Sequence, residues 1–139
     1  MFAGLAGNYI LEFETQLSPT APVSDQLNLG VPKATLRGTL GAQAGAVSVV
    51  SFVNYRDGVT GLYGTPTGTA EYSANSYTTV DLRVTYTFPK DGFAEGTELA
   101  LIANDVFDRT PPFFPGTDGI GGAYNPIGRF VALNLRTSF

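Results

Sequence analysis

Two features of this sequence could do chemistry: a pair of acidic residues and a glycine-rich stretch. Glu12 and Glu14 are two residues apart, so in a strand both side chains share one face, and two carboxylates can divide acid and base catalysis between them. The stretch 116–122 is rich in glycine, like the loops that bind phosphate groups, but Pro126 follows it where a helix would have to begin. We interpret the acids as a solvated strand face and the glycines as a loop.

The residue types that are missing exclude most catalytic mechanisms. Among its 139 residues the chain has no cysteine and no histidine, so it lacks thiolates, disulfides, the usual general base and the commonest metal ligand. We therefore expect no enzymatic activity, no catalytic residue, no cofactor and no metal. Twelve acidic residues against eight basic ones give a net charge of −4, which disfavours nucleic acid as a partner. The length is that of a single domain.

Alternation of apolar and polar residues predicts that β-strands position these side chains. The clearest case is 79–88, and the same pattern recurs at 5–14, 34–43 and 130–139. Two further segments, 46–55 and 97–107, are apolar and favour strands. Their weaker alternation leaves open which side chains lie on which face. The result is about six strands of about ten residues each, longer than strands of soluble proteins usually are.

The connections between these strands alternate in length. They are long at 18–32, 56–76 and 108–127, and short around 43–45 and 89–96. Short turns at one end and long loops at the other are typical of an up-and-down membrane barrel. At a tilt of about 45°, ten residues cover about 23 Å, close to the apolar band of an outer membrane. The sequence therefore predicts an all-β fold: an antiparallel, up-and-down transmembrane β-barrel segment that is not closed by itself.

The side chains expected on the two strand faces agree with this prediction. One face carries charged and polar residues that a wet lumen tolerates better than a packed core, namely Glu12, Glu14, Arg37, Asp81, Arg83, Asn134 and Arg136. Aromatic residues occur near the expected strand ends, where a membrane barrel has its interfacial girdles. They are Tyr55, Tyr77, Phe88, Phe107 and Phe139.

Several segments resemble the closing strands of TonB-dependent outer-membrane receptors. The resemblance lies in 77–88, 104–113 and 128–139, and 54–58 is similar to the strand end that precedes them. It extends over roughly 32–139 and implies a location in the bacterial cell outer membrane. The resemblance also implies a barrel of about 22 strands with a plug domain inside. Such receptors import siderophores, other metal chelates, cobalamin or carbohydrates, driven by the TonB complex.

On this resemblance, residues 1–139 form the C-terminal portion of the receptor β-barrel, with the plug domain absent. The opening segment 1–11 has no positive n-region and makes a poor signal peptide. The expected partners are outer-membrane lipid, the remainder of the barrel and plug, the TonB complex through that plug, and the outer-membrane assembly machinery. Because open strand edges are costly in hydrocarbon, we do not expect this stretch alone to be a stable transporter.

Two sets of residues are candidates for function. A terminal aromatic residue with apolar residues at alternating positions before it resembles the signal read by the assembly machinery, here Phe139, Leu135, Leu133 and Val131. The alternative is a last strand that simply ends in apolar residues. Aromatic residues of the long loops either contact a ligand or pack the loops together: Tyr63, Tyr72, Phe113, Phe114 and Tyr124. The segment 108–113, with two prolines, is expected to end a strand and stiffen the following loop.

Two other functions stay open from the sequence. One is a different outer-membrane protein, a small β-barrel or adhesin that works by binding; a plug and TonB box encoded upstream would argue against it. The other is a secreted soluble β-sandwich that binds or hydrolyses carbohydrate; such a module would be soluble without detergent.

Overall fold

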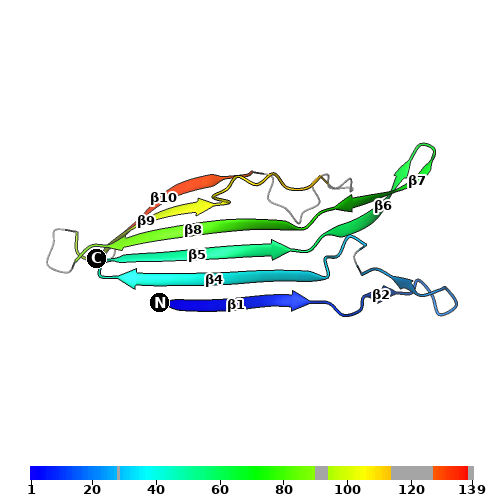
Figure 1. Cartoon of the computed structure of the whole chain (residues 1–139), viewed down its shortest axis with the longest axis horizontal. Helices are drawn as coiled ribbons and strands as arrows, with labels where there is room; N and C mark the ends of the chain where they lie inside the picture. Colours follow the sequence, from blue (N-terminus) through cyan, green and yellow to red (C-terminus); the bar gives the residue numbers. More distant parts are fainter. Residues whose placement is uncertain (28, 90–93, 114–126, 138–139) are drawn as a thin grey trace.

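The computed structural model describes residues 1–27, 29–89, 94–113 and 127–137, and that part of the chain contains β-strands and no helix. Six strands form one antiparallel sheet in the order β1-β4-β5-β8-β9-β10 (Figure 1). Their bounds are β1 (Phe2–Tyr9), β4 (Ala34–Ala44), β5 (Val47–Arg56), β8 (Tyr77–Thr87), β9 (Thr97–Asn104) and β10 (Phe130–Thr137). The prediction of an antiparallel all-β chain is confirmed. No helix in the described ranges has the length and apolar character needed to cross a membrane.

This main sheet is open. Each strand pairs with its neighbours in chain order, β1 pairs with β4 alone, and β10 pairs with β9 alone among the described residues. The outer edges of β1 and β10 therefore have no strand partner in that part of the chain, as we expected for a segment that does not close by itself. With an even number of up-and-down strands, β1 and β10 run in opposite directions along the two edges (Figure 1).

The connections alternate in length as predicted. The turn between β4 and β5 consists of Gly45 and Ala46, and the positive φ of Gly45, 57°, suits the first position of a tight hairpin turn. The connection from β8 to β9 is also short. The long connections 10–33, 57–76 and 105–129 all leave the opposite end of the sheet. The antiparallel order thus gathers the three long connections at one end.

Two of the long connections contain strands that were not predicted from the sequence. A short ladder joins β2 (Glu14–Thr15) to β3 (Ser24–Asp25), and a longer hairpin joins β6 (Val59–Thr65) to β7 (Gly68–Ala74). Figure 1 shows both hairpins beyond the end of the main sheet. The expectation that 56–76 is a loop was therefore wrong. Its hairpin turns at residues 66 and 67, a Pro-Thr pair.

Two predicted strands end earlier than expected. The first was expected to run to Glu14, but β1 ends at Tyr9, and one further backbone bond from Ile10 N to Lys33 O closes the ladder. Glu12 and Glu14 are exposed and lie beyond the main sheet, so the prediction that they line its polar face was wrong. The strand predicted at 97–107 ends at Asn104, because Asp105 takes a left-handed φ of 47° that interrupts the extended backbone.

The main sheet is a single layer, so the chain has little interior. The buried apolar side chains among the described residues are Val59, Ala74 and Ala100. Many large apolar residues are exposed instead, including Leu5, Leu40 and Leu133. Most apolar side chains of the sheet therefore have no protein layer against them.

Candidate functional site

The strand register places every charged residue of the main sheet on one face. Arg37 pairs with Asn54, which pairs with Thr79, so these three side chains share the face that we call the polar face. Following the same register across all six strands assigns to it the charged residues Arg37, Arg56, Asp81, Arg83, Glu98 and Arg136. The register thereby shows which side chains of β5 and β9 lie on each face, a question that the sequence left open.

The opposite side, which we call the apolar face, carries no charged residue on any of the six strands. Its larger side chains include Leu5, Leu36, Leu40, Val49, Val53, Val80, Leu82, Val84, Leu99, Leu101, Val131, Leu133 and Leu135. Leu5 is 77% exposed and Leu133 is 69% exposed. Transferring such a side chain from water to an apolar medium is favourable by about 1.5–3 kcal/mol. Covering this face with lipid or protein is therefore strongly favoured over leaving it in water.

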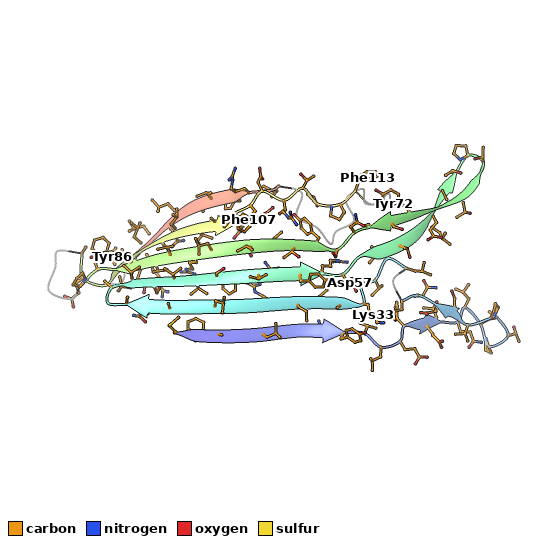
Figure 2. The ribbon with its side chains drawn as sticks, in the orientation of Figure 1. Lys33, Asp57, Tyr72, Tyr86, Phe107 and Phe113 are labelled. Carbon is orange, nitrogen blue, oxygen red and sulfur yellow. The ribbon has the colours of Figure 1, made fainter. Side chains whose placement is uncertain are left out.

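Tyrosines flank the apolar face at both ends. Tyr9 and Tyr55 lie at the end from which the long connections leave. Tyr86 lies at the short-turn end, labelled in Figure 2, with the Phe88 ring edge-on at 5.0 Å. Tyr77, which we had grouped with them, lies on the polar face instead, and its hydroxyl donates to the carbonyl of Arg109 at 2.7 Å.

A hydrogen-bonded network on the polar face joins β5, β8 and the turn after β9. Asn54 Nδ2 donates to Asp81 Oδ2 at 2.9 Å, and the backbone N–H of Asp105 donates to Asp81 Oδ1 at 3.0 Å. The carboxylate of Asp105, 5% exposed, accepts from the backbone N–H of Arg109 at 2.9 Å through Oδ2. Oδ1 of Asp105 is buried and has no hydrogen-bond partner among the described residues. Asp81 thus joins Asn54 of β5 through one oxygen and holds the end of β9 through the other.

The segment 108–113 is anchored at its start. Asp108 has a φ of 53°, and its carboxylate accepts from the backbone N–H of Arg129 at 2.8 Å, with the Arg129 guanidinium 3.9 Å away. This contact holds the residue before β10 against the turn after β9. The arrangement is compatible with the expectation that the segment stiffens the loop mouth.

Two of the long connections contact their neighbours directly. The rings of Tyr72, from β7, and Phe113 meet edge-to-face with centroids 5.8 Å apart, and Figure 2 shows them side by side. The backbone N–H of Gly30 donates to the carbonyl of Thr60 at 2.8 Å. The β6–β7 hairpin is therefore tied both to the connection before β4 and to the segment after β9.

The remaining predicted site residues fall in three groups. Val131, Leu133 and Leu135 lie on the apolar face of the edge strand β10, all strongly exposed. Tyr72 and Phe113 are in contact with each other, which supports packing between the loops for this pair. Tyr63 belongs to β6, and its side chain is outside the described part of the structure, as are the whole residues Phe114, Tyr124 and Phe139 and the glycine-rich stretch 116–122.

Two pairings that the sheet creates were not predicted from the sequence. Arg37 lies over the ring of Phe52, with its Cζ 4.3 Å from the ring centroid. Asp81 meets Asn54 across β5 and β8. The only signal available was that Arg37, Asp81 and Asn54 are polar residues within strand segments; their proximity depends on the register between strands.

Comparisons of the chain with protein-family models, with curated proteins and with solved structures found no match.

Proposed function

We propose that this chain is the C-terminal part of the β-barrel domain of a TonB-dependent receptor in a bacterial outer membrane. The receptor performs no covalent chemistry. It imports a scarce nutrient such as a siderophore, another metal chelate, cobalamin or a carbohydrate, using energy that the TonB complex delivers through the plug.

The separation of the two sheet faces is the observation that carries this proposal. One face presents only uncharged residues over six neighbouring strands, and the other holds all the charges of the sheet. Outer-membrane barrels need this division, because their strands alternate between lipid and a wet lumen. A soluble β-sandwich would need a second sheet packed over the apolar face, and the described residues supply none.

Strand length and aromatic placement support the same proposal. β4, β5 and β8 have 10 or 11 residues, within the roughly 9–11 that a tilted membrane strand needs, and β1, β9 and β10 have 8, one residue short of it. Tyr9 and Tyr55 at one end, with Tyr86 and Phe88 at the other, are placed as two interfacial girdles would be. The step from an outer-membrane barrel to a TonB-dependent receptor depends on the resemblance of the closing strands.

Two adjacent valines give a matched test of the proposal that the apolar face contacts membrane lipid. Val49 lies on the apolar face opposite Val84, and Val50 lies on the polar face opposite Arg83. We expect Val49→Glu to make partition into phospholipid vesicles less favourable by about 1–2 kcal/mol. A smaller fraction of the chain should then float with the vesicles. Val50→Glu is expected to float like the parent, since its carboxylate would face the lumen and Arg83. Equal behaviour of the two variants, or a parent chain that is a soluble monomer without detergent, would contradict the proposal.

The transport part needs a separate test. We expect the gene region upstream of these strands to encode a plug domain and a TonB box, and neighbouring genes to indicate the cargo. An upstream region with neither would favour a small outer-membrane barrel or an adhesin, even if the Val49 and Val50 variants behave as expected.

A further inference from the structure

Arg37 is a cation of the polar face that the described residues hold in place without an ion pair. The guanidinium of Arg37 lies over the Phe52 ring at 4.3 Å, on the neighbouring strand β5. Stacking on an aromatic ring holds the guanidinium plane and leaves its N–H groups at the edge free to bind. In the described part of the chain no carboxylate lies within ion-pair distance of Arg37; the ion pair found there joins Arg129 to Asp108.

Asp81, an acidic residue of the same face, already accepts two hydrogen bonds. Asp81 lies across β5 from the strand of Arg37, and its two oxygens accept from Asn54 and from the backbone of Asp105. These two bonds hold the Asp81 carboxylate toward Asn54 and the turn after β9, and no ion pair joins it to Arg37 among the described residues. The charge of Arg37 is therefore left for a group that these residues do not supply.

Beside Arg37 the sheet is hollowed over β1, β4 and β5, and the lining includes polar-face residues together with Gly7, Leu36 and Tyr55 of the apolar face. This shallow depression has a volume of about 490 Å³, and Arg37 is its only charged lining residue among those described. Ala6 lies directly opposite Arg37 in the register, so a methyl group stands where a larger side chain would fill the space. Asn8 and Thr35, opposite each other one step further along, add an amide and a hydroxyl to the lining.

We propose that Arg37 and this depression bind an oxyanion, the carboxylate or phosphate group of a molecule that enters from the polar side. A planar guanidinium offers two parallel N–H donors that match two oxygens of such a group. The amide of Asn8 and the hydroxyl of Thr35 can add further donors. Arg37 also lines an adjoining depression of about 250 Å³, but there it shares the lining with Asp81 and Asp105, whose acidic side chains make that space less suited to an anion.

The oxyanion has two possible sources, a free small molecule or a carboxylate of another polypeptide segment. For the first source, the full chain in detergent is modified with phenylglyoxal, and the rate at Arg37 is followed by mass spectrometry with and without inorganic phosphate. We expect phosphate to slow the modification of Arg37 by about tenfold or more, a difference of roughly 1.4 kcal/mol, and to leave Arg83 unaffected. Arg83 is the matched control because it lies on the same face and its Nε already donates to Thr85.

A variant that fills the depression tests the role of the depression separately from that of Arg37. Ala6→Leu retains Arg37 but fills the space opposite it, so phosphate protection of Arg37 is expected to be lost. Ala3→Leu, on the apolar face of the same strand, is expected to leave the protection intact. If both variants retain protection, the depression is not the binding site and the proposal fails.

For the second source, Arg37→Lys places an amine at the same position in the complete protein, and a carbodiimide couples that amine to any carboxylate in contact. Coupling to a peptide outside the residues described here would identify a polypeptide as the source and support the proposal. Coupling to Asp81 would overturn it, since Arg37 would then be paired within its own sheet. The proposal would also be overturned if the Arg37→Lys variant coupled to nothing and phosphate gave Arg37 no protection. The vesicle flotation of Val49→Glu and Val50→Glu is independent of all these outcomes.

Discussion

Asp81 holds the backbone N–H of Asp105 at 3.0 Å, so a side chain in the middle of β8 fixes the point where β9 ends. Asp105 follows β9 directly, and its own carboxylate receives the N–H of Arg109 four residues later. The Asp81 carboxylate thus holds the turn after β9, and the Asp105 carboxylate holds the segment that follows the turn. Asp105 can take the left-handed φ that the turn needs because Asp and Asn tolerate that region better than most residues.

Removing the first carboxylate should loosen this end of the sheet. We expect Asp81→Ala to lower the free energy of unfolding by about 1–3 kcal/mol, because Asn54 and the N–H of Asp105 both lose a charged acceptor. Urea unfolding of the chain in detergent, followed by circular dichroism, measures it. Glu71→Ala, an exposed acid on β7, is the control and should change stability by less than about 0.5 kcal/mol. Equal losses in both variants would show that the network adds no stability.

A glycine before β10 is the second point to test. Gly128 has a φ of 71°, and a Cβ built on it would lie 2.8 Å from Asp108 Oδ1, the oxygen that accepts from the N–H of Arg129. Gly128→Ala should therefore cost about 1–2 kcal/mol and separate Asp108 from Arg129. Faster tryptic cleavage after Arg129 in the folded chain would report the change. Gly64→Ala, where nothing lies within 4 Å of the added methyl, should leave that rate unaltered.

The aromatic contact between the loops makes a third prediction. Tyr72 and Phe113 meet edge-to-face, so a double-mutant cycle with both changed to Ala should give a coupling energy of about 0.5–1.5 kcal/mol. The same cycle with Tyr72 and Phe107 should give a coupling near zero, because no ring contact joins that pair. Additive effects in the first cycle would mean that the two rings are free of each other in solution, as a ligand-binding role would allow.

The alternating pattern predicted the two faces of the main sheet well where it was strict. Val80 and Leu82 lie on the apolar face and Asp81 on the polar face, because successive side chains of any extended chain point to opposite sides. The same rule could not show where a strand ends. Alternation continues from β1 through Phe13, yet the ladder ends near Tyr9, since extended conformation alone does not supply a partner strand.

The contacts on the polar face could not be predicted from the pattern. Phe52 is apolar, but it lies on the polar face because its register places it opposite Asp81, and the stacking of Arg37 covers part of its ring. That register depends on the two-residue turn at Gly45, which pairs Ala44 with Val47 and thereby fixes every later pair of β4 and β5. A shift by one residue would move Arg37 to the apolar face, so the candidate site depends on that turn.

The last strand makes the final prediction. Leu133 and Leu135 are 69% and 68% exposed on the apolar face of β10, whose outer edge has no strand partner in the described structure. A protein that recognises this edge by strand addition would read the side chains of one face. Changing both leucines to Ser should therefore slow insertion by the purified assembly machinery about tenfold or more, since each loses apolar contact. Changing Asn134 and Arg136 of the polar face to Ser should leave the rate close to that of the parent, and deletion of Phe139 should slow it as the leucine changes do. If the polar-face variant is slowed equally, recognition depends on the strand as a whole and not on its apolar face.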